Sequence, residues 1–393
     1  MAKRIAVGLR PWLLGLGLVI GGCSDPAGTA QDLGGGGPPD SVDMSAPGMQ
    51  RPGSTDPLTV RGMTITMDQV VQFAPIVSLH TAESYLPCSI EYLLSGATLI
   101  DDAGGKPPLP NPTQQDLYQN AGSNFRVVID PSRLAGEPLD AGKSVSAPMY
   151  VAVQVPADQS YVDLTFIFLF TYNGAQCTRV KVPFADFNCI VQHFAEHQGD
   201  IEGMTVRVKP DFSAVLQVRY EAHGDSTFYN PSDVAFMNNH ALARLGLDSH
   251  ASYNGLGKND NDWITLASYS AVGLGADFVD IITRTGPLWT PFGVDGSGRA
   301  VPNGGLRFVG LNDQDEPVNA EVWAKFSGRL GSHQSNSYDD VVGIGSPLTG
   351  AQHGYASTLA QAVVAAGLVP ADDRAGDGPG GLGGRDYIHL NQK

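Results

Sequence analysis

The chain has 393 residues and a formal net charge of −16, with 40 acidic side chains against 24 basic ones. This balance excludes non-specific binding to nucleic acid, because phosphate binding needs clustered Lys and Arg. It leaves room for a cationic partner or a metal ion, and acidity is also a common means of staying soluble.

The first 22 residues have the features of a targeting segment. A basic start is followed by the apolar run 12–20, which is shorter than the ~20 residues that a membrane span needs. The basic side chains are Lys3, Arg4 and Arg10. Without residues 1–22 the chain keeps 21 basic and 40 acidic residues, a formal charge of −19.

The run ends in Ile20-Gly21-Gly22-Cys23, which resembles a bacterial lipobox. In such motifs the chain is cut before the cysteine, which is acylated. We therefore expect residues 1–22 to be a lipoprotein signal peptide and Cys23 to be the lipidation site. Ser24 follows the cysteine, and by resemblance to enterobacterial sorting this predicts a lipid anchor in the bacterial outer membrane. The alternative is an ordinary signal peptide with a chance cysteine.

Composition divides the rest of the chain into three parts. Residues 23–57 are rich in Gly, Pro, Ser, Asp and Ala, and we expect a flexible tether. Residues 58–355 are expected to form one domain. Residues 356–393 are expected to hold one short amphipathic helix, 357–367, and a disordered tail.

Period-2 alternation of apolar and polar residues predicts many short strands. The strongest strand is 161–172, which we expect to be central and covered on both faces in its second half. Short helices are expected at 67–74 and after Ser89, and a loop at 101–122. The other expected strands are 59–66, 74–80, 125–129, 149–155, 204–208, 214–223, 241–250, 278–283, 306–309 and 320–326. This pattern predicts an all-β fold, an antiparallel β-sandwich or jelly-roll-like single domain with long loops and a few short helices.

The stretch His197-Gln198-Gly199-Asp200-Ile201-Glu202 concentrates potential chemistry within six residues. Asp200 and Glu202 share the even phase of the apolar residues in the strand that follows, so both carboxylates should face the apolar side. Buried carboxylates need a cation, a donor set or a proton. This stretch is therefore our first candidate for a ligand or metal site.

Four histidines lie at or near expected strand ends: His80, His197, His223 and His250. Histidine and carboxylate together suit a divalent metal ion or general acid–base chemistry, whereas single histidines at strand ends commonly cap backbone groups. We take His197, Asp200, Glu202, His223 and His250 as the candidate site and His80 as a secondary candidate. Against convergence, His223 and His250 fall in the polar phase of their expected strands, so only a bulge or a loop could re-aim them.

The cysteines beyond Cys23 are Cys88, Cys177 and Cys189. An exported chain meets an oxidising compartment, and Cys177 and Cys189 are the most plausible disulfide pair because they flank a short segment. Cys88 would then be a free, buried thiol. With an odd number of cysteines, other pairings remain open.

Four segments resemble the vacuolar protein sorting-associated protein 62 family. They are the opening motif at 74–80, with Glu83, Tyr85, Pro87 and Ser89 beyond it, the Tyr-Asn-Gly turn at 172–174, the segment 197–202, and Ser-His-Ala-Ser-Tyr at 249–253. Ile201, Cys88 and Leu330 stand where the family has Trp, Ser and Trp. The segment 197–202 is also similar to one motif of necrosis-inducing toxins, and that similarity implies a β-sandwich that holds a divalent ion and binds lipid head groups.

Three functions remain open. The first is a lipid-anchored envelope protein whose β-sandwich binds a ligand, or a lipid or glycan head group, with a divalent metal ion as candidate cofactor. The second is a metal-assisted surface hydrolase with Glu202 or His250 as base and Asp200 as ligand. The third is a structural envelope protein. The common enzyme motifs are absent from the sequence, which favours a non-enzymatic role.

Overall fold

The computed structural model describes residues 53–141, 144–174, 178–182, 185–187, 196–222, 225–255, 261–271, 274–283, 286–332 and 379–391. Several predicted features lie outside these residues: the expected lipidation site Cys23, the expected disulfide pair Cys177 and Cys189, the candidate His223 and the helix expected at 357–367.

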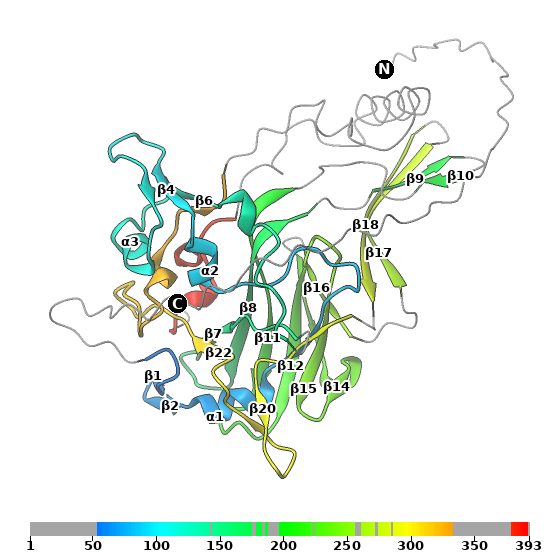
Figure 1. The fold of residues 1–393 in the computed structure, drawn as a ribbon. Helices are drawn as coiled ribbons and strands as arrows, with labels where there is room; N and C mark the ends of the chain where they lie inside the picture. The colour runs from blue at the N-terminus through cyan, green and yellow to red at the C-terminus, as the bar shows by residue number, and fades with distance from the viewer. Residues whose placement is uncertain are drawn as a thin grey trace, which may run out of the picture. The chain divides into compact units, whose positions relative to one another are not determined.

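A six-stranded sheet forms the centre of the fold (Figure 1). Its order is β13 (Asp225–Tyr229), β12 (Val215–Ala222), β11 (His197–Val208), β8 (Val162–Asn173), β7 (Met149–Gln154) and β22 (Leu306–Phe308). All neighbours pair antiparallel except β22 and β7, which are parallel.

The other sheets are smaller. One has the order β14 (Phe236–Met237), β15 (His240–Leu245), β3 (Ile76–Ser78) and β19 (Leu288–Trp289), and β16 (Ser252–Asn254) also pairs with β15. Another has the order β23 (Arg329–Leu330), β6 (Phe125–Val128), β4 (Thr98–Asp101) and β5 (Leu109–Pro110). A third has the order β10 (Ala185–Phe187), β9 (Thr178–Val182), β18 (Leu274–Thr283) and β17 (Asn261–Ala271). Two hairpins join β1 (Leu58–Val60) to β2 (Met63–Ile65) and β20 (Gly293–Val294) to β21 (Ala300–Val301).

The described helices are short. The α-helices are α1 (Met67–Val70), α2 (Ile90–Leu94) and α3 (Gln114–Gln119). The 3-10 helices are η1 (Val71–Phe73), η2 (Pro131–Arg133), η3 (Pro231–Asp233), η4 (Val322–Lys325), η6 (Leu382–Gly384) and η7 (Asp386–Ile388). Across the described part of the chain, no helix has the length and apolar character to span a membrane.

The strand β8 lies at the centre of two hydrophobic cores, and all of its twelve residues are buried. Its even residues, such as Phe166 and Phe170, belong to the first core, together with Met204 of β11 and residues of β3 and β15. Its odd residues Ile167 and Leu169 belong to the second core, with residues of α2, β4 and β6. The predicted coverage of this strand on both faces is confirmed, and so is the all-β sandwich class.

Three expectations about local structure are wrong. The single strand expected at 59–66 is the hairpin of β1 and β2, which turns at Arg61 and Gly62. The region 101–122 is not one loop, because it contains α3, which Thr113 caps by accepting a hydrogen bond from the backbone N–H of Asp116. The region 320–326 is not a strand but carries η4. Here the side-chain oxygen of Asn319 accepts a hydrogen bond from the N–H of Glu321, and such local bonds favour turns over strands.

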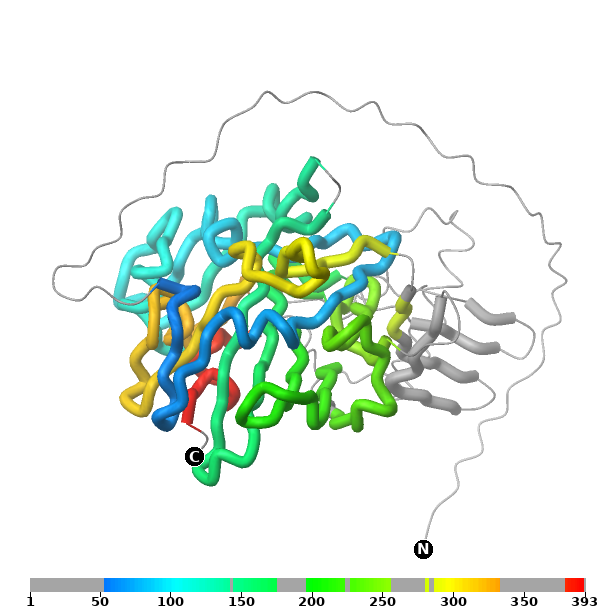
Figure 2. The backbone as a smooth tube through the Cα atoms, turned by 90° about the horizontal axis from the view of Figure 1, so that it is seen from below, coloured from blue at the N-terminus to red at the C-terminus, as the bar shows by residue number. Residues whose placement is uncertain are grey.

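The end of the chain is ordered at residues 379–391, unlike the mobile tail that composition predicts. Leu382 and Ile388 are buried in the second core. The side-chain amide of Gln154 donates to the carbonyl oxygens of Asp386 and His389, which ties this segment to β7 (red in Figure 2).

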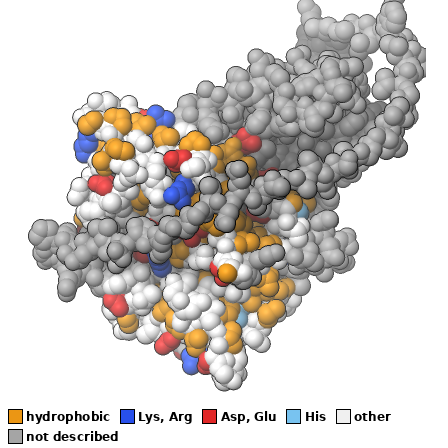
Figure 3. Space-filling model, viewed as in Figure 1, with side chains coloured by type: hydrophobic (Ala, Val, Ile, Leu, Met, Phe, Trp, Pro, Cys, Tyr) orange, Lys and Arg blue, Asp and Glu red, His pale blue; other side chains and the backbone are white. Residues whose placement is uncertain are grey.

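On the face seen in Figure 3, acidic and basic side chains are scattered among other residues. This face shows no broad basic surface of the kind that binds nucleic acid.

Candidate functional site

The imidazole of His250 is fully buried between two carboxylates. Its Nδ1 lies 2.9 Å from Asp200 Oδ2, and its Nε2 lies 3.2 Å from the carbonyl oxygen of Tyr85 and 3.6 Å from Glu83 Oε1. Carbonyl oxygens and ionised carboxylates only accept hydrogen bonds, so both ring nitrogens carry a proton. Burial by itself lowers the pKa of His250, but the charge of Glu83 and the bonds to Asp200 and Glu83 outweigh it and raise the pKa to about 10. The ring is therefore an imidazolium at neutral pH.

The strand β11 places Asp200 and Glu202 on the same face of the central sheet. Asp200 pairs with Phe170 of β8, and Glu202 pairs with Phe168. Directly paired residues point to the same side of a sheet, and both phenylalanines belong to the first core. The inward phase that the sequence predicts for the two carboxylates is what the structure shows.

Gly199 is the point in β11 at which the side-chain direction changes, so that Gln198 points away from the first core and Asp200 points toward it. The preceding Gln198 points the other way, because its side chain bonds both the N–H and the carbonyl of Ile129. Gly199 has a φ of +69°, and a Cβ at this position would lie 1.8 Å from the carbonyl oxygen of Leu330. Only glycine fits both the left-handed backbone and the close approach.

A turn, and not a strand, carries His250 to Asp200. β15 ends at Leu245, and the N–H of Gly246 then bonds the carbonyl of Ala251 across the turn. Asp248 and His250 have positive φ angles of 63° and 52°. The strand parity that argued against convergence is therefore wrong for His250, because the residue is no longer in a strand. The loop re-aims its side chain.

Glu83 fastens the loop after β3 to this turn. Its Oε1 accepts from the N–H of Tyr85 at 2.8 Å, and its Oε2 accepts from the N–H of Asp248 at 3.0 Å. Burial opposes ionisation, but His250 lowers the pKa of Glu83 below its usual value. Our sequence reasoning did not place Glu83 in the site. Its position within the family's opening motif was the only signal.

Two further carboxyl groups in the cluster hold their protons more tightly than usual. Burial and the charge of Asp200 raise the pKa of Glu202 well above its ordinary value, although Arg385 and His250 oppose this. Within the described part of the chain, the Glu202 carboxylate accepts no hydrogen bond. Burial and the charge of Glu83 raise the pKa of Asp248 to about 6. Four carboxyl groups thus lie around one imidazolium, and ionisation of all four would give the cluster an excess of negative charge.

The Tyr-Asn-Gly turn closes one side of the cluster. The ring centroids of Tyr85 and Tyr172 lie 4.8 Å apart, and the two ring planes are inclined at 52°. The N–H of Gly174 donates to the carbonyl of Asp248, and a Cβ at Gly174 would lie 2.6 Å from the ring of Tyr85. Four segments that are distant in sequence therefore meet here: 83–85, 172–174, 197–202 and 248–250.

The other histidines of the sequence prediction have separate surroundings. His197 Nδ1 lies 2.6 Å from the carbonyl oxygen of Gly199 and donates to it, which leaves Nε2 as the ring nitrogen that could meet a ligand. His80 Nδ1 accepts from the N–H of Ala82 at 3.0 Å, and burial lowers the pKa of His80. His80 Nε2 is buried and has no hydrogen-bond partner among the described residues. His223 lies outside the described residues.

The fit of a divalent ion can be judged from the donor set. Asp200 and Glu202 supply the hard oxygen donors that such ions prefer, and His197 Nε2 is chemically available. Both nitrogens of His250 are used. In the described ranges, no three His, Cys, Asp or Glu side chains stand close enough together to form a metal centre. A metal ion therefore stays a prediction, with Asp200 and Glu202 as its principal ligands.

Cys88 is a free, buried thiol, and burial raises its pKa well above the ordinary value.

No curated protein matches the chain. The solved structures similar to it include the necrosis and ethylene inducing protein 2 from the causal agent of cocoa's witches' broom disease, at 16% identity and a TM-score of 0.27, covering 52% of this chain and 73% of that one. Another is the NLPPya protein in complex with glucosamine, at 11% identity and a TM-score of 0.29, covering 76% and 95%.

The sequence itself carries the classification. The model of the vacuolar protein sorting-associated protein 62 family matches residues 63–262, about half of the chain. This range includes all four segments that meet at the carboxylate cluster. The chain belongs to the vacuolar protein sorting-associated protein 62 family.

Proposed function

We propose that the protein is a lipid-anchored envelope protein whose β-sandwich binds a polar ligand, the head group of a lipid or glycan, at the carboxylate cluster. The excess of negative charge around His250 carries this proposal. Glu202 and Asp248 both have raised pKa values, which means that their ionised forms are not fully compensated by the groups around them.

A cation relieves this repulsion, and a divalent ion is the candidate that fits the oxygen donors. Asp200 and Glu202 would hold it, and the ion would supply a bridge to the oxygens of a head group. The protein's own residues fix those two carboxylates. His250 binds Asp200 on one side, and Glu83 keeps His250 and the 248–250 turn in place.

The rim of the cluster supports binding of a polar head group. Tyr85 and Asp248 are partly exposed beside it, and the buried ring of Tyr172 packs against the ring of Tyr85. Aromatic rings with polar tips commonly border sites that hold polar ligands at a surface. Ile201, which stands in place of the family's Trp, points into the second core and not to this rim.

The hydrolase alternative depends on Glu202. His250 is an imidazolium with both N–H groups bound, so it has no lone pair with which to act as a base. Glu202 has a raised pKa and no hydrogen bond from the described residues, which suits a general base or acid. A hydrolase would therefore lose its activity in a Glu202→Gln variant and keep its ligand affinity.

Vesicle binding by a Cys23→Ser protein, which lacks the anchor, tests the proposal. We expect it to sediment with vesicles that contain phosphatidylethanolamine and glycolipid, in the presence of Mg²⁺ or Ca²⁺, more than with phosphatidylcholine vesicles. Asp200→Asn and Glu202→Gln should abolish the difference, and Asp158→Asn, on an exposed loop, should preserve it. Equal sedimentation of all four proteins would refute head-group binding at this cluster.

A further inference from the structure

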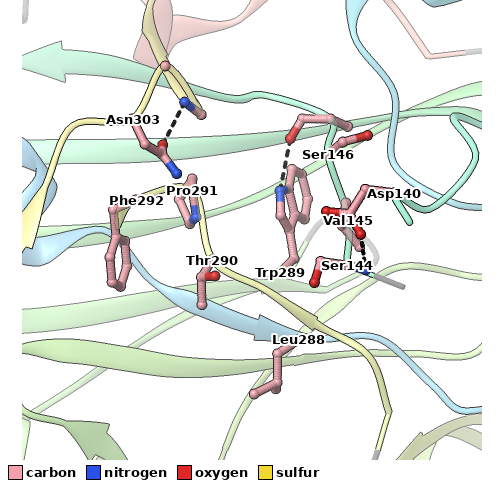
Figure 4. A pocket seen from close by; sticks show the side chains of 13 residues that line it. Asp140, Ser144, Val145, Ser146, Leu288, Trp289, Thr290, Pro291, Phe292 and Asn303 are labelled. Atoms are coloured by element: carbon pink, nitrogen blue, oxygen red, sulfur yellow. Dashed lines mark hydrogen bonds between the residues drawn. The ribbon is translucent and has the colours of Figure 1, made fainter. Parts of the chain in front are cut away.

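A recess of about 400 Å³ is lined by residues outside the carboxylate cluster (Figure 4). Three segments line it: Asp140 with 144–147, 288–292 and 303–305. No lining residue belongs to the carboxylate cluster, so the two sites share no residue. The volume falls within the range of about 300–1,000 Å³ that is typical of small-molecule sites.

Two polar side chains in the recess, Asp140 and Asn303, each use one of their two polar atoms in a hydrogen bond within the protein. Asp140 Oδ1 accepts from the N–H of Ser144 at 2.8 Å, and Asn303 Oδ1 accepts from the N–H of Gly305 at 2.9 Å (Figure 4). Within the described ranges, Asp140 Oδ2 and Asn303 Nδ2 have no hydrogen-bond partner. A carboxylate oxygen that accepts and an amide nitrogen that donates are thus pre-oriented for a ligand.

Three hydroxyl groups add further unused donors and acceptors. Ser144, Ser146 and Thr290 line the recess, and their hydroxyls make no hydrogen bond to the described residues. Buried groups fix the wall behind them. Trp289 is 1% exposed, and its Nε1 donates to the carbonyl of Ala147 at 3.0 Å.

The recess also has an apolar surface. Leu288 is 51% exposed, and Pro291 is a second apolar residue of the lining. None of the described lining residues is basic, so nothing in the lining recognises a phosphate or a carboxylate. The combination of acceptor, donor, hydroxyls and an apolar patch matches a ligand with many hydroxyls and an apolar C–H face.

We propose that this recess binds a neutral saccharide. The sugar hydroxyls donate to Asp140 Oδ2 and accept from Asn303 Nδ2, and the C–H face of the ring packs on Leu288. This site goes beyond the proposed head-group site and does not depend on its cation.

Saturation-transfer NMR on the mature protein with glucose, galactose, mannose, N-acetylglucosamine and lactose, each at millimolar concentration and with chelator present, tests the proposal. At least one sugar should bind. Asp140→Ala and Asn303→Ala should each weaken it about tenfold or more, because each removes a hydrogen bond to the ligand. Leu288→Ala should also weaken it.

Two control variants locate the site. Asp158 lies on an exposed loop and, like Asp140, accepts a hydrogen bond from the N–H of a nearby serine, here Ser160, so Asp158→Ala should leave affinity unchanged. Asp200→Asn, in the other site, should also leave it unchanged. The proposal is overturned if none of the five sugars binds, if binding survives the Asp140→Ala/Asn303→Ala double variant, or if Asp200→Asn abolishes it.

Discussion

The ring of His250 lies flat on the ring of Phe170, with centroids 3.7 Å apart and planes 2° apart. Phe170 stands directly opposite Asp200 in the β8–β11 pairing, so the charged imidazolium is held by an aromatic face on one side and a carboxylate at its edge. This geometry favours the protonated ring, since the face of an aromatic ring attracts cations. The positive charge of His250 is thus part of the fold.

Removal of this charge should destabilise the protein strongly. In His250→Gln, Asp200 and Glu83 lose their shared counter-charge, and breaking a buried ion pair costs about 3–5 kcal/mol. Urea unfolding followed by circular dichroism measures the loss. The matched control is His389→Gln, a partly exposed histidine, which should change stability by about 0.5 kcal/mol or less. If His250→Gln loses less than about 1 kcal/mol of unfolding free energy, the ion pairs of His250 with Asp200 and Glu83 do not stabilise the fold.

A series of three glycine substitutions tests the close approach of β11 to β23. Gly199→Ala combines a left-handed backbone with a clash on Leu330, and we expect a loss of about 3–5 kcal/mol. Gly104 has a φ of +72° and nothing within 4 Å of a Cβ, so Gly104→Ala should cost about 1–2 kcal/mol. Gly296→Ala has neither feature and should be nearly neutral. Equal losses at Gly199 and Gly104 would contradict the clash.

Glu321 should make stability depend on pH. Burial raises its pKa from 4.5 to about 7, and the nearby charge of Glu91 adds to this, although Arg307 opposes it. The native state therefore binds this proton more tightly than the unfolded chain. As pH rises from 4.5 to about 7, this group alone lowers the free energy of unfolding, by up to ~3 kcal/mol.

The variant Glu321→Gln has no such titration. Its stability relative to wild type should improve between pH 5 and pH 8, as measured by urea unfolding at both values. Asp158→Asn, an exposed site, should show almost no change in the same comparison. A difference between Glu321→Gln and wild type that is equal at the two pH values would refute the shift.

The lipid anchor makes a separate prediction. Cys23→Ser should abolish palmitate labelling and move the protein out of the detergent phase, because no other cysteine follows an apolar run with small residues. Labelling that persists in the variant would rule out Cys23 as the lipidation site. Peptide mapping without reduction tests the Cys177–Cys189 disulfide in the same preparation, and a bridge that contains Cys88 would contradict the pairing.

The sequence was most informative where a strand is regular. Alternation along β11 places Asp200 and Glu202 on the inner face, and the pairing with Phe170 and Phe168 confirms this. It was least informative where the chain leaves a strand. The pattern through Leu245 continues to His250, but two residues with positive φ turn that histidine inward, and no periodicity encodes such a turn.

Glu83 could not be found from local pattern. Its role depends on Asp248 and His250, which lie about 165 residues away in sequence. Similarly, the sequence of 379–391 does not predict burial, because its few apolar residues, such as Leu382 and Ile388, stand among glycines and polar residues without a strand or helix period. Long-range packing decides both cases, and a single sequence without periodicity carries no signal for it.

Thermal unfolding with and without a divalent ion tests most directly whether a bound cation offsets the charge of the Asp200 and Glu202 carboxylates. An ion that binds only the native state stabilises it by mass action, by about 2.7 kcal/mol at a hundredfold excess over Kd. We predict that Mg²⁺, Ca²⁺ or Mn²⁺ raises the Tm of wild type by about 2 to 4 °C over the chelated protein, and that the Tm of Glu202→Gln does not change. No shift of wild type with any of the three ions, or an equal shift in Glu202→Gln, would contradict the claim.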